Sequence, residues 1–341
     1  MSEKRYLILA EAFSHDPHHG KTLRGVLRYR RESVVAILDT TRAGESMDGV
    51  PIVARIDEAL RFEPNTAIVG VATQGGVFPA DWRALLRACV EHGLDLENGL
   101  HVRLKDDREL VQVARKHGVE LRDLREPPPD LSTATGANLD VDAKIVLTIG
   151  SDCAIGKMTA ICELDLEARR RGLRSVFVPT GQTGIAIAGW GIAVDAVVSD
   201  FLAGAAERLV VDGAKRGDLL WVEGQGAILH PVYSGVTLGL IHGSAPHVYV
   251  LCHEVGRTEI EGDPTETPIP PLADLIELHE RMSLPRRPAK VVAIALNTAP
   301  VSEEEARGAI AEAEAETGLP ADDPVRFGGT KLLEAVLKGL P

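Results

Sequence analysis

Short runs of hydrophobic residues alternate along the chain with longer segments in which hydrophobic residues recur every three or four positions. The short runs are typical of strands and the longer segments of helices. Alternation of the two predicts parallel sheets covered by helices, the α/β class. In the first part of the chain the predicted strands are 6–9, 33–38 and 66–71, and the predicted helices are 21–29, 56–62 and 79–92.

The second part of the chain repeats this alternation with strands that are apolar along most of their length. Such strands are typical of a doubly wound parallel sheet that is buried on both faces, with ligands at the carboxyl ends of the strands. The predicted strands are 145–148, 175–178, 219–222, 248–251 and 291–296, and the predicted helices are 157–171, 200–213, 271–281 and 303–318.

Three consecutive prolines at 127–129 separate the two parts. Proline cannot continue a helix or a central strand, and the small polar residues that follow are typical of a linker. We therefore predict an N-terminal Rossmann-like domain at 1–126, a linker at 127–138 and a P-loop NTPase-like domain at 139–341. The first predicted strand lacks a following G-x-G-x-x-G, so a dinucleotide site is not indicated there.

The strand at 145–148 runs into a glycine-bounded loop and then into a helix, which is the pattern of a phosphate-binding loop. Five residues separate Gly150 from Gly156, and Lys157 adds a positive charge. Backbone N–H groups of such a loop bind anions together with the helix N-terminus. The residues predicted to bind the phosphates are Gly150, Ser151, Asp152, Cys153, Ala154, Ile155, Gly156, Lys157, Met158 and Thr159.

Glu223 follows the strand at 219–222 and is itself followed by Gly-Gln-Gly. In P-loop folds an acid at this place lies beside the phosphates and holds Mg²⁺, because a hard cation prefers oxygen ligands. We predict Glu223 as a metal ligand and catalytic residue. The alternative is an acid that only accepts hydrogen bonds from nearby loop amides.

Other polar residues follow the predicted strands of the second domain, where ligands gather. His230 is the predicted general base, because an imidazole titrates near neutral pH, although a packing role is an alternative. Arg257 is suited to bidentate binding of a substrate carboxylate, and Asn297 to a nucleobase edge. The other predicted substrate-binding residues are Thr180, Gln182, Thr183, Tyr233 and Ser234.

The composition argues against several classes of binding partner. The net charge of −13 and the aromatic content of 4% argue against binding to nucleic acid. No apolar run reaches the roughly 20 residues of a membrane span and no signal-peptide core follows the start, so we expect no membrane partner and a cytoplasmic location. The four cysteines lack metal-site spacing, and Cys153, with no histidine beside it in sequence, is predicted to be structural rather than nucleophilic.

The residues at 150–159 together with Glu223-Gly-Gln-Gly226 resemble the P-loop type of dethiobiotin synthetase, which also has five residues between its loop glycines. A closer similarity runs through 230–246 and 251–257. These segments resemble a two-domain family that includes D-glutamate N-acetyltransferase, with a Rossmann-like N-terminal domain and a P-loop C-terminal domain.

The second resemblance implies an acyltransferase that moves an acetyl group from acetyl-CoA to the amino group of an amino acid, D-glutamate in the first place. Lys157 and the loop amides would then anchor CoA phosphates, and a homo-oligomer is expected. The alternative is a ligase or kinase that activates a carboxylate with ATP and Mg²⁺, with Glu223 on the metal. A third possibility is a module that senses CoA or nucleotide without catalysis.

Overall fold

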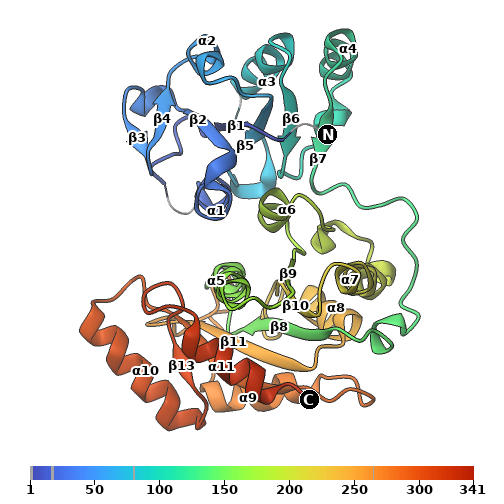
Figure 1. The fold of residues 1–341 in the computed structure, drawn as a ribbon, viewed down its shortest axis with the longest axis vertical. Coiled ribbons are helices and arrows are strands. Elements are labelled where there is room, and N and C mark those ends of the chain that lie inside the picture. Colours follow the sequence, from blue (N-terminus) through green and yellow to red (C-terminus); the bar gives the residue numbers. More distant parts are fainter. Residues whose placement is uncertain (1–2, 17–18, 80, 264) are drawn as a thin grey trace. The chain divides into compact units, whose positions relative to one another are not determined.

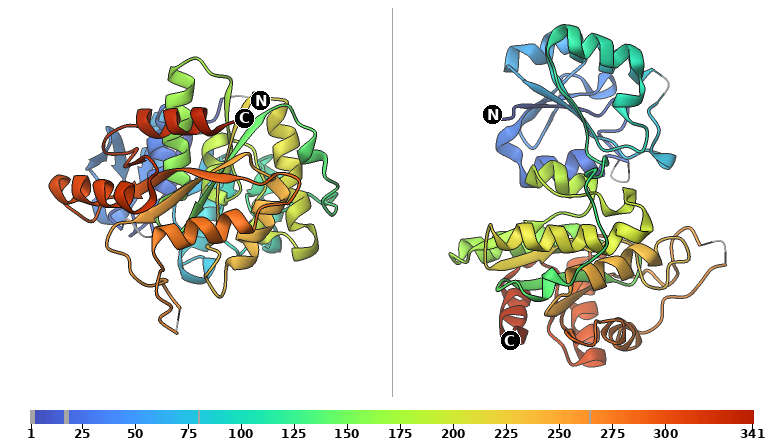
Figure 2. Two further views of the ribbon diagram at one scale, coloured as in Figure 1. Left: turned by 90° about the horizontal axis from the view of Figure 1, so that it is seen from below. Right: turned by 90° about the vertical axis from the view of Figure 1, so that its right-hand side faces the viewer.

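The computed structural model describes residues 3–16, 19–79, 81–263 and 265–341. The chain divides into two compact units, each a sheet with helices packed on it (Figures 1 and 2). The N-terminal unit comprises Met1–Glu126 and Ile185–Trp190, and the C-terminal unit comprises Pro127–Gly184 and Gly191–Pro341. The sequence did not indicate that the short segment Ile185–Trp190 packs with the N-terminal unit.

The N-terminal unit holds a seven-stranded sheet in the order β3-β4-β2-β1-β5-β6-β7. All neighbouring strands are parallel except the β3–β4 pair, which is antiparallel. The apolar strands at the centre are fully buried, which explains their near-continuous hydrophobic sequence. The strands are β1 Tyr6–Leu9, β2 Val34–Leu38, β3 Ser46–Met47, β4 Val50–Val53, β5 Thr66–Val69, β6 Asp95–Asn98 and β7 Leu121–Asp123; the helices are α1 Lys21–Tyr29, α2 Ile56–Ala59, α3 Trp82–Glu91 and α4 Arg108–His117.

Two arginines of this unit explain why Ile185–Trp190 belongs to it. Arg30 Nη1 donates to the carbonyl oxygen of Ala186 at 3.0 Å, and Arg122 Nη2 donates to that of Gly189 at 3.3 Å. Ala186 lies in α6, Gln182–Ala188, a helix whose first turn belongs to the C-terminal unit. The boundary between the units therefore passes through a helix as well as through the proline segment.

The C-terminal unit holds a six-stranded sheet, all parallel, in the order β13-β12-β11-β8-β10-β9. The strands are β8 Lys144–Gly150, β9 Ser175–Val178, β10 Leu219–Val222, β11 Val248–Glu254, β12 Lys290–Asn297 and β13 Ala321–Asp322. The chain leaves β8 toward one edge of the sheet and leaves β11 toward the other. The carboxyl ends of β8 and β11 thus flank the topological switch point, where doubly wound folds bind ligands.

Helices cover both faces of this second sheet. Helix α5, which follows β8, packs with α11, whereas α7 packs with α8. Because the crossover after β8 and the later crossovers run in opposite directions along the sheet, right-handed connections place α5 and α7 on opposite faces. The helices are α5 Lys157–Arg170, α7 Ser199–Ala214, α8 Ser234–Ser244, α9 Leu272–Arg281, α10 Glu303–Thr317 and α11 Thr330–Gly339.

The sequence pattern predicted the α/β class and most long elements within a few residues, and that class is confirmed. It missed several short strands and helices α6 and α8, and also α4 and α11, which are amphipathic helices of ten residues each. The strands at β3, β4, β6, β7 and β13 have two to four residues, and several contain charged positions. The apolar residues of helix α8 are not confined to one face, so it lacks the periodicity of a helix with one buried face.

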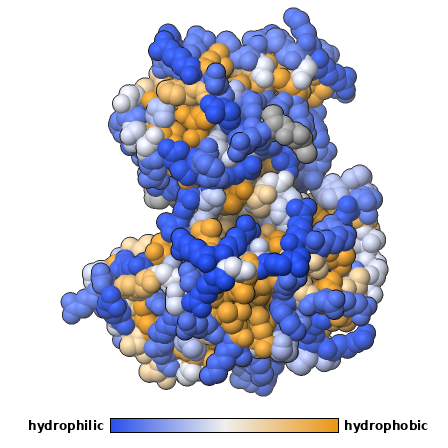
Figure 3. Space-filling model, viewed as in Figure 1, coloured by the Kyte–Doolittle hydropathy of each residue, from blue (hydrophilic) through white to orange (hydrophobic). Residues whose placement is uncertain are grey.

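Hydrophilic side chains are interspersed with hydrophobic ones on the face drawn in Figure 3. Within the described part of the chain, no helix combines the length and the apolar character that crossing a bilayer requires.

Candidate active site

The loop between β8 and α5 turns sharply around Gly150. A Cβ atom on Gly150 would lie 2.7 Å from Ile155 Cδ1 and 3.2 Å from Lys157 Cδ, because both side chains fold back over this glycine. Two further residues of the loop have left-handed backbones, Ala154 with φ of 55° and Gly156 with φ of 103°. A non-glycine residue held at positive φ is a local strain of the kind found at functional sites.

The turn leaves a row of backbone donors without protein acceptors. Among the residues that the structure describes, none accepts a hydrogen bond from the N–H groups of Ala154, Ile155 or Gly156. The next N–H groups belong to the first turn of α5, which starts at Lys157 and has 14 residues. Since the first turn of a helix lacks internal acceptors and carries a partial positive charge, this loop is built to bind an anion.

Lys157 lies inside the loop and points back into it. Its side chain is buried, and Nζ donates to the carbonyl oxygen of Asp152 at 2.6 Å. Burial lowers the pKa of the ammonium, and this is opposed by the acidic groups around it, Cys153, Cys252, Asp152 and Glu223. A buried ammonium with a single neutral acceptor is ready to gain a negatively charged partner.

Glu223 follows β10 and is buried beside the turn after β9. Its Oε2 accepts hydrogen bonds from the N–H groups of Thr180 at 2.9 Å and Gly181 at 3.0 Å. In the described part of the chain nothing donates to Oε1. Burial raises the pKa of Glu223 to about 7, although the two amides and Lys157 lower it. The carboxyl group therefore changes its charge near neutral pH.

Gly224 holds this acid against the loop strand. Its N–H donates to Thr148 Oγ1 at 2.9 Å, and an added Cβ would lie 1.8 Å from the carbonyl oxygen of Thr148. Thr148 belongs to β8, so a side chain at 224 would force β10 and β8 apart.

We expect Gly224→Ala to lower the free energy of unfolding by about 3 kcal/mol, as an overpacked core position. Gly308→Ala is the matched control, because a Cβ there meets nothing within 4 Å and the residue lies in α10. That change should raise stability by about 1 kcal/mol through helix propensity. Urea unfolding of both variants measures the difference, and equal stabilities would contradict this account of Gly224.

Arg257 has other partners than the predicted substrate carboxylate. Its guanidinium donates to Asp152 Oδ2 at 3.0 Å, to Glu254 Oε1 at 2.8 Å and to Glu261 Oε2 at 2.7 Å. Asp152 is fully buried and also accepts from the N–H of Glu261. Three carboxylates of its own chain thus occupy Arg257, which disfavours carboxylate capture and favours a role in holding the loop in place.

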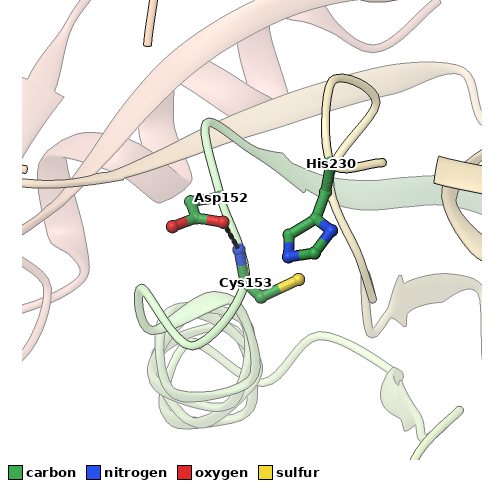
Figure 4. Close-up of side chains that lie close together, drawn as sticks. All are labelled: Asp152, Cys153 and His230. Atoms are coloured by element: carbon green, nitrogen blue, oxygen red, sulfur yellow. Dashed lines mark hydrogen bonds between the residues drawn. The ribbon is translucent and has the colours of Figure 1, made fainter. Parts of the chain in front are cut away.

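His230 lies beside the loop, next to Cys153, and Figure 4 shows the two side chains pointing toward each other. The N–H of Val232 donates to His230 Nδ1 at 3.1 Å. The neutral ring consequently carries its proton on Nε2, the nitrogen on the side of the sulfur. A general base needs a lone pair at the atom that faces the proton, so this geometry favours a hydrogen-bond donor over the predicted base.

The remaining predicted residues lie around these groups, and some of their polar atoms already have hydrogen-bond partners in the protein. The amide of Asn297 is occupied at both ends, since Nδ2 donates to Glu254 Oε2 at 2.8 Å and Oδ1 accepts from the N–H of Ala299 at 3.2 Å. That arrangement disfavours contact with a nucleobase. Ser151 Oγ lies 2.9 Å from His253 Nδ1.

Thr180 lies on the turn after β9 and is fully buried, and its hydroxyl donates to the carbonyl oxygen of Glu223 at 2.8 Å. Gln182 and Thr183 begin α6 instead of lying in the predicted turn. Tyr233 is half exposed and its ring centroid lies 4.6 Å from that of His230. Ser234 starts α8 instead of continuing the predicted loop. Met158 and Thr159 lie in the first turn of α5.

The described residues bring together one set of three potential metal ligands, and Glu223 is not among them. The set is Asp152, Cys153 and His230, with one ligand atom of each within 4.8 Å of the others. Both oxygens of Asp152 already accept hydrogen bonds, Oδ1 from Cys153 N–H and Oδ2 from Arg257 and Glu261. A cation there would compete with the guanidinium.

The sequence did not predict the roles of four residues that shape the site. Gln225 Nε2 donates to the carbonyl oxygen of Thr180, Glu254 and Glu261 hold Arg257, and Val232 fixes the tautomer of His230. Gln225 lies in the quoted Glu-Gly-Gln-Gly turn, so its position carried a signal. For the other three, no sequence pattern indicates which partner they meet.

Comparisons with known proteins agree with this architecture. A family model described as the DUF1611 P-loop domain matches residues 132–333, and one described as the DUF1611 Rossmann-like domain matches residues 39–127. A crystal structure of a DUF1611 family protein from Anabaena variabilis is 40% identical, with a TM-score of 0.90 over 98% of this chain and 99% of that one.

Two curated relatives bear the same name. A D-glutamate N-acetyltransferase of Tritonibacter scottomollicae is 39% identical over 287 residues, which is 82% of this chain and 84% of the relative. One from Pseudoalteromonas is 36% identical over 275 residues, 80% of this chain and 81% of the relative.

Proposed function

This chain belongs to the DUF1611 family, and from that premise we propose that it is an N-acetyltransferase that moves the acetyl group of acetyl-CoA to the amino group of D-glutamate. The observation that carries the proposal is the identity of 36–39%, over about four fifths of the chain, to two relatives named for that reaction. The acyltransferase class rests on these relatives, and the donor and acceptor are the proposed part.

The anion-binding loop supports acyl transfer on chemical grounds. Attack on a thioester places negative charge on the carbonyl oxygen, and donors aimed at that oxygen stabilise the transition state. The free N–H groups of Ala154, Ile155 and Gly156, with the Lys157 ammonium beside them, are donors of this kind. The same donors suit a CoA phosphate, but the pantetheine arm separates the phosphates from the thioester, so one loop serves one end of the molecule.

Glu223 is the proposed base for the acceptor. The amino group of an amino acid is an ammonium at neutral pH and must lose a proton before it attacks. The carboxyl group of Glu223 has a pKa of about 7 and an Oε1 atom without a donor, which suits it to take that proton. His230, whose Nε2 carries a proton, fits the role of donor instead.

Purified protein incubated with acetyl-CoA and D-glutamate tests the proposal. We expect release of free CoA thiol that depends on the amino acid, together with N-acetylglutamate identified by mass spectrometry. Parallel reactions with L-glutamate and with other D-amino acids define the acceptor.

A third reaction contains Mg²⁺ and ATP without acetyl-CoA. Amino-acid-dependent release of ADP or phosphate there, without thiol release in the first reaction, would replace the transferase by a carboxylate-activating enzyme. Binding of acetyl-CoA without turnover of any amino acid would indicate a protein that senses CoA without catalysis.

A further inference from the structure

The thiol of Cys153 lies in the anion-binding loop and faces His230, although the two residues are far apart in sequence. We propose that Cys153 is the acetyl acceptor of the enzyme: it takes the acetyl group from acetyl-CoA as a thioester and passes it to the amine. This proposal rests on the proposed acetyltransferase function. It assigns a covalent intermediate and makes Cys153 the nucleophile.

The geometry around the sulfur is that of an activated nucleophile. Cys153 is partly exposed, unlike Cys89, Cys162 and Cys252, which are buried. One ring nitrogen of His230 lies within 4.8 Å of the sulfur, and the ring is fixed by Val232 N–H on Nδ1 and by the Tyr233 ring packed against it. An oriented N–H donor beside a cysteine at a helix N-terminus stabilises the thiolate, which is the nucleophilic form of the side chain.

The charges around the sulfur are mixed. Burial raises the pKa of the Cys153 thiol, and Asp152 and Glu261 add to this, whereas Lys157 and Arg257 lower it. Asp152 and Glu261 are both bonded to Arg257 and share its single positive charge with Glu254, so only part of their negative charge is compensated. Lys157, the start of α5 and the Nε2–H of His230 remain as groups that stabilise a thiolate.

The first step is an exchange of thioesters. The Cys153 thiol loses its proton to solvent, the thiolate attacks the carbonyl carbon of acetyl-CoA, a carbon–sulfur bond to Cys153 forms, and the bond to the CoA sulfur breaks. The electron pair leaves with CoA as a thiolate, so no net proton is needed. The oxyanion that forms between these events lies next to the free N–H groups that follow Cys153 in the chain.

The second step releases the product. The deprotonated amine attacks the carbonyl carbon of acetyl-Cys153, a carbon–nitrogen bond forms, and the bond to Sγ breaks. The electron pair returns to the sulfur. Glu223 holds the proton that the ammonium lost before the attack, and the second proton, which the nitrogen loses as the amide forms, goes to the CoA thiolate released in the first step. Cys153 is again a thiolate, hydrogen-bonded by His230.

A metal ion at the same three residues is the competing explanation. It is disfavoured because Arg257 and the backbone already use both oxygens of Asp152, and because Lys157 adds a further positive charge next to the thiol. A divalent cation would have to displace or neutralise these groups.

The role proposed for Cys153 also determines which end of acetyl-CoA the loop binds. If Cys153 receives the acetyl group, the thioester lies in the loop and the phosphates lie elsewhere. Acetyl-pantetheine, which keeps the thioester and lacks the phosphates of CoA, should then still acetylate the enzyme.

The test omits the amino acid and follows the enzyme itself. Wild-type protein is mixed with acetyl-CoA, quenched in acid and examined by intact-mass and peptide mass spectrometry, and exchange of labelled CoA into acetyl-CoA is measured in parallel. We expect one acetyl group on Cys153 and exchange without acceptor. Cys153→Ala should show neither and lose kcat by on the order of 10³-fold or more. Cys89→Ala, in the core of the N-terminal unit, is the control and should retain both.

His230 is tested as a stabiliser of the thiolate through the pH dependence of Cys153 alkylation by iodoacetamide. His230→Ala should move the midpoint to higher pH and slow acetylation about 10- to 100-fold. His230→Gln, which can keep an N–H donor toward the sulfur, should restore part of the loss. A purely structural role would leave the midpoint unchanged.

Three results would overturn the inference. The first is product formation by wild-type protein with no acetyl group on Cys153 and no exchange, which leaves the transferase function intact. The second is Cys153→Ala with wild-type kcat. The third is one tightly bound zinc per chain that is lost in Cys153→Ala. Absence of N-acetylated product from any amino acid would instead remove the proposed function, and this inference with it.

Discussion

Replacing Glu223 by Gln is expected to lower kcat/KM for the proposed acetyl transfer about 10²- to 10⁴-fold, the usual contribution of a general base. Gln keeps the size of the side chain and an oxygen that can accept from Thr180 and Gly181. It removes only the group that takes a proton. In wild-type protein kcat/KM should rise with pH through about 7, as Glu223 ionises, and this rise should be missing in the variant.

The same substitution is expected to stabilise the fold above neutral pH. The pKa of Glu223 is about 7 in the folded protein and 4.5 for the ordinary group, so ionisation opposes folding. Stability contributed by the protonated group is fully present below pH 4.5 and is lost as the pH rises to 7. Glu223→Gln avoids that loss, and its free energy of unfolding should exceed that of wild type by up to about 3 kcal/mol at pH 8.

Glu207→Gln is the matched control, because its expected change in the free energy of unfolding has the opposite sign. Glu207 is also buried, but hydrogen bonds from Thr135 and Gly136 outweigh the effect of burial and lower its pKa. The variant should therefore be less stable than wild type at neutral pH, and the gap should narrow as the pH falls and the carboxylate becomes protonated. Urea unfolding between pH 4 and pH 8 measures both. A Glu223→Gln protein that is active and no more stable would contradict the assignment of this acid.

Replacing Lys157 by Met is the second substitution with a large expected effect. We expect kcat to fall about 10²- to 10³-fold, as when a donor to a developing oxyanion is removed. The methionine side chain fills the space of the lysine without its charge. Because burial lowers the pKa of Lys157, the charged group costs folding energy, and the variant should unfold at a higher urea concentration than wild type.

Two acetyl donors distinguish what Lys157 binds. If the thioester carbonyl lies in the loop, Lys157→Met should lose kcat equally with acetyl-CoA and with acetyl-pantetheine. A rise in KM confined to acetyl-CoA would instead show that the loop holds phosphates, which the sequence pattern predicted, and would contradict the role given to Cys153. Lys215→Met is the control, because Lys215 pairs with Asp212 on the surface and should behave as wild type with both donors.

The contrast between Arg257 and Lys157 shows why site prediction from sequence was uneven. Both are cations near the ends of predicted strands, and both were predicted to bind anionic ligand groups. Lys157 follows directly on the loop residues 151–156, so its position relative to the loop is set by the local sequence. The partners of Arg257 include Asp152, which the sheet brings to it from another strand, and they leave it little capacity for a ligand.

The sequence by itself determined the class of the fold, the glycine-bounded loop with its lysine, and the acid that follows the neighbouring strand. These features depend on hydrophobic periodicity and on backbone preferences, which act between residues close in the chain. Only the tertiary structure decided that Cys153 faces His230 and that Asp152 accepts from Arg257. These two pairings depend on β8 lying between β10 and β11, an order that no local pattern encodes.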